Sequence, residues 1–145
     1  MSAILSVVLL IGWMAPLKAA TVEDIANRSK CDIGDIAYYV GQALQYPRWD
    51  NHPPVFEDAQ VCLTRGVGDC KCHATVAMEV MGYCGYKALL VTVEDRYQSH
   101  ALVLFKDKKG NRGYLDVPNY RFFDGDTPWK EIVSRIPGWH WEVRE

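Results

Sequence analysis

Residues 66–74 read Gly66-Val67-Gly68-Asp69-Cys70-Lys71-Cys72-His73-Ala74, a tight connection that leads into a helical pattern. The two glycines allow backbone angles that other residues resist. Apolar residues then recur at helical spacing through Met81, and Gly82 fits the C-terminal cap. A helix N-terminus presents free N–H groups and a partial positive charge, and both favour a thiolate. The stretch therefore predicts that Cys70 is an activated thiol at the start of a helix.

Two further motifs place a histidine and a carboxylate on neighbouring strands. Residues 99–105 read SHALVLF and residues 114–117 read YLDV, and residues 107–111 between them have the composition of a hairpin turn. Because His100 and Asp116 flank one hairpin, adjacent strands are expected to bring them together with Cys70. In such a set the histidine holds the thiolate as an ion pair and protonates the leaving amine, while the carboxylate orients the ring.

These motifs resemble those of the transglutaminase-like superfamily of cysteine enzymes. In that family a Gly-Asp-Cys motif opens a helix, a His-Ala-hydrophobic strand follows, and an aspartate lies on the next strand. Gly68-Asp69-Cys70, His100-Ala101-Leu102-Val103 and Leu115-Asp116 occupy these places in the same order, within a likeness that covers roughly residues 46–120.

The sequence is most similar to the bacterial transglutaminase-like cysteine peptidases, which are often exported. Trp49-Asp50 and Pro53-Pro54 resemble the approach to the nucleophile in those proteins. The chain departs from them directly after the cysteine, because residues 71–73 are Lys, Cys and His where the relatives commonly carry acidic and aromatic residues. This departure concerns the subfamily and the substrate.

The resemblance implies a papain/transglutaminase-like α+β core that acts on amide bonds of a protein or peptide substrate, without a cofactor or metal. It also implies an oxyanion site, in which the backbone N–H of Cys70 is one donor and an upstream side chain is the second. Gln42, Trp49 and Gln60 all fit the second donor, and the sequence does not choose among them. For Trp49 the simpler interpretation is packing in the core.

Helix signals come first along the chain and strand signals follow, which indicates α+β rather than alternating βαβ units. Thr21 and Asp24 have the spacing of a capping box for a short first helix. The other expected helices cover residues 33–44, residues 55–64 (closed by Gly66), the segment from Cys70, and a short one to residue 136; the expected strands cover residues 87–93, 101–105, 112–117 and 139–143.

Length and composition indicate one globular domain. The chain has 145 residues, of which 49% are hydrophobic and 23% charged, and its formal net charge is −2. A chain of this size buries roughly 68–70% of its unfolded surface, enough for a core. The balanced charge gives no electrostatic footprint for a nucleic acid. The oligomeric state is not readable from the sequence.

The N-terminus has the pattern of a secretory signal peptide. Residues 3–17 carry no charge and are mostly apolar, and Lys18, Ala19 and Ala20 follow. A span of about 15 residues that ends in small residues fits a signal peptide, because a membrane span needs about 20. We therefore expect residues 1–20 to be removed and residues 21–145 to form a single catalytic domain. It would be periplasmic or secreted, without a stable membrane span.

Five cysteines in an exported chain leave at least one thiol outside intramolecular disulfides. Cys70 and Cys72 are about 200° apart around a helix, so they should not pair with each other. If Cys70 is the nucleophile, four cysteines remain and allow up to two disulfides by three connectivities. We expect at least one disulfide among Cys31, Cys62, Cys72 and Cys84.

Three alternatives remain open from the sequence. A transamidase would use the same thioester, with an amine in place of water. A zinc site could use Cys70, Cys72, His73 and Cys84, although Cys-x-Cys lacks the usual gap and no second knuckle occurs. A non-catalytic binding module could keep the fold.

Overall fold

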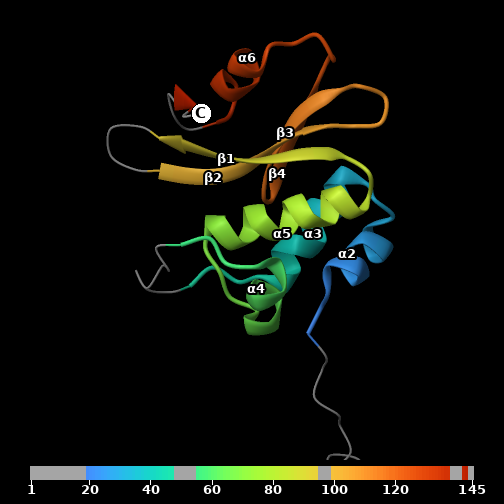
Figure 1. Ribbon diagram of the computed structural model, residues 1–145, viewed down its shortest axis with the longest axis vertical. Coiled ribbons are helices and arrows are strands. Elements are labelled where there is room, and N and C mark those ends of the chain that lie inside the picture. Colours follow the sequence, from blue (N-terminus) through green and yellow to red (C-terminus); the bar gives the residue numbers. More distant parts are fainter. Residues whose placement is uncertain (1–18, 48–54, 95–98, 138–141, 144–145) are drawn as a thin grey trace, which may run out of the picture.

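The computed structural model describes residues 19–47, 55–94, 99–137 and 142–143, and these residues form an α+β domain (Figure 1). Four helices lie on one side of an antiparallel sheet, and a short helix lies on the other side. The predicted α+β class is therefore confirmed. The helices are α2 (Val22–Ser29), α3 (Ile33–Ala43), α4 (Ala59–Arg65), α5 (Cys70–Tyr83) and α6 (Trp129–Ser134).

The sheet has five strands in the order β4-β3-β2-β1-β5, and all its pairs are antiparallel. The central strand β2 is buried over five consecutive residues because helices cover both faces of the sheet. A buried strand of this kind has a continuous apolar sequence rather than an alternating one. The strands are β1 (Lys87–Glu94), β2 (Ser99–Lys106), β3 (Arg112–Asp116), β4 (Asn119–Phe123) and β5 (Glu142–Val143).

Two hydrophobic clusters hold the layers together. In the larger one, Val76 and Val80 of α5 and Val103 and Phe105 of β2 belong to one buried set that includes α2, α3 and α4. The smaller cluster joins the opposite face of the sheet to α6, where Ile132 is fully buried. Helix α5 thus packs against the middle of the sheet.

Local sequence signals set the helix ends. Thr21 and Asp24 form the predicted capping box at the start of α2, with bonds of 3.0 and 3.1 Å. Gly66 ends α4 in the left-handed region at φ 72°, as predicted. Asp69 caps α5 by accepting the Lys71 N–H at 2.9 Å. These caps satisfy N–H and C=O groups that helix ends otherwise leave unpaired.

The structure differs from the expected elements in three places. Helix α5 continues through Gly82 to Tyr83 and is capped by Cys84, and the left-handed glycine that follows it is Gly85 at φ 86°, so the prediction that Gly82 caps this helix is wrong. Helix α4 begins at Ala59 rather than at residue 55, because Asp58 has extended backbone angles and occupies the N-cap position. Strand β4 was not expected, since its five residues are mostly exposed and lack an apolar pattern. Of the last expected strand only β5 lies within the described residues. The expected loop at residues 48–54 lies outside them.

Two disulfides join the helices, and Cys70 is the one free cysteine. Cys31–Cys84 joins the segment between α2 and α3 to the C-terminal end of α5, and Cys62–Cys72 joins α4 to the first turn of α5. This confirms both the expected bridging and the prediction that Cys70 and Cys72 do not pair.

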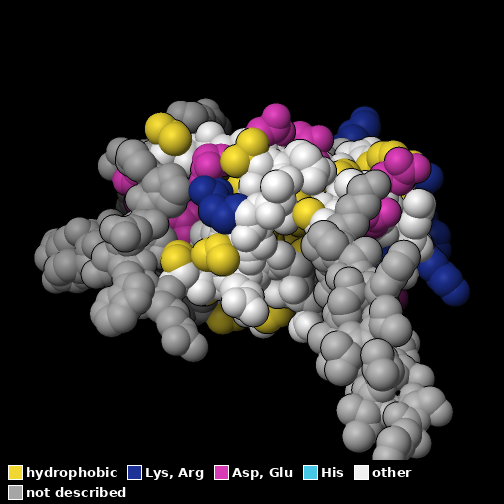
Figure 2. All heavy atoms as spheres, turned by 90° about the horizontal axis from the view of Figure 1, so that it is seen from below, with side chains coloured by type: hydrophobic (Ala, Val, Ile, Leu, Met, Phe, Trp, Pro, Cys, Tyr) yellow, Lys and Arg dark blue, Asp and Glu magenta, His cyan; other side chains and the backbone are white. Residues whose placement is uncertain are grey.

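The described surface of the helical side mixes acidic, basic and hydrophobic side chains (Figure 2). This distribution agrees with the nearly balanced net charge of −2. Within the described residues, every helix is too short or too polar to cross a membrane. The expected signal peptide at residues 1–20 lies almost wholly outside those residues, so it stays a prediction.

Candidate active site

Cys70 is the first residue of α5 and its thiol is half-buried. The preceding residue, Asp69, is 5% exposed, and its carboxylate accepts the Lys71 N–H and contacts Lys71 Nζ at 2.5 Å. This arrangement fixes the first turn of the helix directly at the nucleophile. It also places Cys70 at the end of α5 where the helix dipole favours a negative charge.

The connection before Cys70 is fastened to the segment that follows α3. Gln45 donates its N–H to Gly66 O at 3.0 Å and accepts the Gly68 N–H at 2.9 Å, which makes a parallel bridge between Gln45 and Val67. A Cβ at Gly68 would lie 2.3 Å from Cys72 Cβ, so only glycine fits between the connection and the Cys62–Cys72 disulfide. The backbone around the nucleophile is therefore held from two sides.

His100 and Asp116 lie together at one end of the pair formed by β2 and β3. Val103 pairs with Leu115, which brings the start of β2 beside the end of β3. His100 Nε2 lies 2.6 Å from Asp116 Oδ1, and both side chains are about one-quarter exposed, at 25% and 24%. The carboxylate is thus placed to fix the orientation of the imidazole ring.

The thiol of Cys70 lies within hydrogen-bond reach of His100 and of the Ala101 N–H. Because Asp116 takes Nε2, Nδ1 is the ring nitrogen left for the thiol. The sequence motifs at residues 68–70, 100–103 and 115–116 therefore meet at one place, with His100 between the other two side chains.

Cys70 and His100 shift each other's ionisation in opposite directions. Burial raises the pKa of the Cys70 thiol, but hydrogen bonds from His100 and Ala101 and the charge of His100 outweigh it, so the pKa is lowered overall. Hydrogen bonds with Asp116 and Cys70 raise the pKa of His100 to about 10, against the opposing effect of burial. Between these two pKa values the favoured state is a thiolate–imidazolium pair, the reactive form of a cysteine nucleophile.

The three expected oxyanion donors lie in different surroundings. Gln42 is an exposed residue of α3. Gln60 lies on α4, and its amide donates to Ala20 O at 3.4 Å and to Thr64 Oγ1 at 3.3 Å, so it is engaged away from Cys70. Trp49 lies outside the described residues. The role of each stays a prediction.

Tyr46 is a site residue that the sequence analysis missed. Its ring stacks on His73 with centroids 4.7 Å apart and an interplanar angle of 20°. Tyr46 is 54% exposed, and its partial burial, followed by the negative charges of Cys70, Asp116 and Asp69, raises the pKa of its hydroxyl far above the ordinary value of 10.0. In the sequence Tyr46 precedes Pro47, and this pair indicated only the end of a helix. No local sequence pattern shows that Tyr46 lies close to Cys70, because the contact depends on the folded chain.

His73 is the residue on which the Tyr46 ring stacks. It is 5% exposed, and its Nδ1 and Nε2 lie 2.8 Å from Asp69 O and 3.1 Å from Leu44 O. A neutral imidazole has one N–H and donates to one of these carbonyls, whereas an imidazolium donates to both. His73 therefore connects the start of α5 to the end of α3, directly behind Tyr46.

The expected alternative zinc set is not assembled. Cys72 and Cys84 belong to different disulfides, and His73 contacts two carbonyl oxygens. Among the described residues, the group with metal-ligand proximity is Glu57, Cys62 and Cys72, whose two sulfur atoms are joined to each other. Glu57 is also paired with Arg65 at 2.6 Å.

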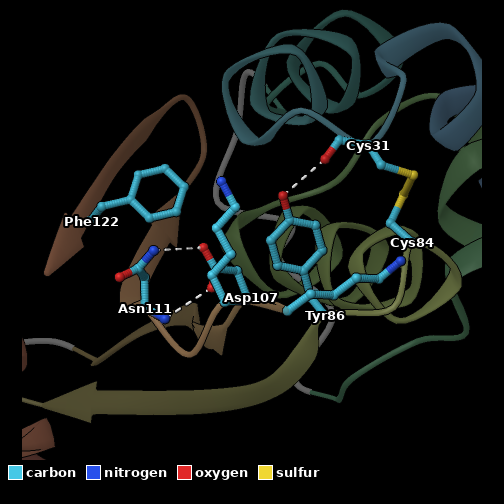
Figure 3. Close-up of a pocket in the computed structure, with 8 residues that line it drawn as sticks. Cys31, Cys84, Tyr86, Asp107, Asn111 and Phe122 are labelled. Atoms are coloured by element: carbon cyan, nitrogen blue, oxygen red, sulfur yellow. Dashed lines mark hydrogen bonds between the residues drawn. A yellow bond between two sulfur atoms is a disulfide. The ribbon is translucent and has the colours of Figure 1, made fainter. Parts of the chain in front are cut away.

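A separate hollow of about 460 Å³ lies beside the turn between β2 and β3, at the opposite end of β2 from His100 (Figure 3). Two of its polar groups already have partners. Tyr86 donates its hydroxyl to Cys31 O at 2.9 Å, and the Asp107 carboxylate accepts from the backbone and the amide of Asn111. These contacts stabilise the turn and the end of α5, and they are distant along the strand from the thiol.

Comparison with known proteins found similarity in structure. No family model and no curated protein matches the chain. A solved structure described as a crystal structure of a TGase aligns with a TM-score of 0.48 and 12% identity, over 86% of this chain and 38% of that chain. This chain thus spans less than half the length of that protein.

Proposed function

We propose that the chain is a thiol enzyme of the transglutaminase-like type that acts on amide bonds, first of all as a cysteine peptidase. The observation that carries the proposal is the contact of His100 with both Asp116 and Cys70, with the thiol at a helix start. This arrangement supplies a thiolate, a proton donor and a group that orients it, which are the components of nucleophilic catalysis.

The reaction has two stages. The Cys70 sulfur attacks the carbonyl carbon of the amide, and the C=O π electrons move to the oxygen. When this tetrahedral intermediate collapses, the C–N bond breaks, the leaving amine takes a proton from His100, and a thioester remains. Water then gives a proton to His100 and attacks the thioester, the C–S bond breaks, and a carboxylic acid leaves the regenerated thiolate. Asp116 keeps the ring in place throughout.

The second candidate function, transamidation, differs only in the last stage, where a primary amine replaces water. Both activities need the same thioester, so the described residues support them alike. The substrate in either case is a protein or peptide, and no cofactor takes part in the steps above.

We further propose that the protein works outside the cytoplasm, in the periplasm or as a secreted enzyme. Two disulfides are typical of an oxidising compartment. The apolar pattern of residues 3–17 is the expected export signal, and residues 21–145 are the catalytic domain.

The experiment is incubation with a peptide library in the presence and absence of a tagged primary amine, followed by mass spectrometry. New peptide ends without the tag indicate hydrolysis, and tagged products indicate transamidation. Cys70→Ser should abolish both with little change in melting temperature, and His100→Ala should remove most of the activity. Undiminished products from folded Cys70→Ser protein would reject the proposal.

A further inference from the structure

Tyr46 is held against the same part of α5 that carries the nucleophile. Its ring stacks on His73, which lies three residues after Cys70, and residues three apart on a helix are neighbours on one face. The preceding residue, Gln45, is hydrogen-bonded to the connection that leads to Cys70. The ring is therefore positioned by the backbone on one side and by an aromatic contact on the other.

The hydroxyl of Tyr46 lies close enough to the site for Cys70 and Asp116 to affect its ionisation. Tyr46 is 54% exposed, and its partial burial together with these negative charges raises its pKa far above 10.0. A phenol in such surroundings keeps its proton at every pH at which the thiolate and the imidazolium coexist. It is thus a permanent hydrogen-bond donor beside a nucleophile that generates negative charge on a substrate oxygen.

Acyl transfer requires such a donor. When a thiolate adds to a carbonyl, the oxygen becomes an anion, and donors already aimed at this position stabilise the transition state. The N–H groups of the first turn of α5 supply donors on the helix side. The described polar side chains of the site are otherwise committed: Asp116 to His100, His100 to Cys70, and His73 to backbone carbonyls.

We propose that Tyr46 is a catalytic residue whose hydroxyl donates a hydrogen bond to the oxyanion formed when Cys70 attacks a substrate carbonyl. This inference rests on the proposed function, because it concerns the intermediate of that reaction. It assigns the second oxyanion donor to the segment after α3 rather than to Gln42 or Gln60.

The test compares two reactions of Cys70 in Tyr46→Phe. Tyr38→Phe is the matched control, because Tyr38 on α3 is 57% exposed and Tyr46 is 54% exposed. Acylation by p-nitrophenyl acetate passes through an oxyanion: the S–C bond forms, the C=O π bond opens, and p-nitrophenolate then leaves. Alkylation by iodoacetamide forms an S–C bond and expels iodide without any oxyanion. Both rates are followed at Cys70 by peptide mapping, and the melting temperature reports folding.

Tyr46→Phe should slow acylation by about 100-fold, the usual effect of losing one oxyanion donor, and should change alkylation less than twofold. Tyr38→Phe should change neither rate. Unchanged acylation in folded Tyr46→Phe protein would overturn the inference. Equal slowing of both reactions would also overturn it, because Tyr46 would then act on the thiolate. A large acylation loss in Trp49→Phe and none in Tyr46→Phe would assign the donor to Trp49.

Failure of the proposed function gives a different result. In that case the wild-type Cys70 reacts with iodoacetamide but is not acylated, and the inference on Tyr46 fails with it. If wild-type Cys70 is acylated and Tyr46→Phe behaves as wild type, only the inference on Tyr46 fails.

Discussion

Replacing Asp116 with asparagine removes the carboxylate that lies 2.6 Å from His100 Nε2. The side chains keep nearly the same shape, so the change acts on charge. The hydrogen bond to Asp116 is the largest cause of the raised pKa of His100, followed by the bond to Cys70, so the variant should lower that pKa. The Cys70 thiolate is still present in the variant, so the pKa of His100 stays above its ordinary value.

The size of the effect follows from the strength of the bond. A hydrogen bond between charged groups contributes about 1.5–3 kcal/mol, and one pKa unit corresponds to 1.36 kcal/mol. The pKa of His100 is about 10 in the native protein, and in the variant it should therefore be lower by roughly one to two pH units. Since a raised histidine pKa stabilises the folded state below the unfolded pKa of about 6.5, this contribution is lost as the pH rises through about 10.

The assay is an NMR titration of protein labelled in its histidine rings. Spectra of His100→Ala assign the His100 signal among the four histidines. Asp126→Asn is the matched control, because Asp126 is exposed and lies between β4 and α6. We expect the His100 midpoint to fall in Asp116→Asn and to stay in place in Asp126→Asn. If native His100 titrates near its ordinary pKa, or if Asp116→Asn leaves its midpoint unchanged, then Asp116 does not raise the pKa of His100.

Two further predictions concern processing and stability. Removing Cys31–Cys84, which closes 53 residues, should cost about 4 kcal/mol, and removing Cys62–Cys72, which closes 10, should cost about 3 kcal/mol. Urea unfolding of the paired serine variants measures both, and a smaller loss for the longer loop contradicts the estimate. Expression through an export pathway should yield a protein without residues 1–20, and a full-length intact mass in the exported fraction argues against a cleaved signal.

The sequence predicted the parts of the site that depend on local order. A glycine-rich connection before Cys70, a helical pattern after it, and a hairpin between His100 and Asp116 are each readable over a few residues. The meeting of His100 and Asp116 also follows, because a hairpin brings the ends of its two strands to the same edge of the sheet. The odd number of cysteines predicted at least one thiol outside intramolecular disulfides, and the motif at the helix start predicted that it is Cys70, which is free in the structure.

The features that the sequence did not predict depend on contacts between distant segments. Tyr46 reaches the site through its stacking on His73 and through the bridge between Gln45 and Val67, and neither contact leaves a local pattern. Strand β4 is an edge strand with mostly exposed residues, so it lacks the apolar signal that identified β1, β2 and β3. The pairing of the disulfides likewise required the packing of α4 and α5.

The central claim is that Cys70 forms a thioester with the acyl part of its substrate. The most direct measurement is acid quenching of the protein during reaction with p-nitrophenyl acetate, followed by peptide mapping. We expect one acetyl group on Cys70 that hydroxylamine removes, that forms much more slowly in His100→Ala, and that is absent in Cys70→Ala. Acetylation confined to surface lysines, or equal acetylation in Cys70→Ala, would contradict the account.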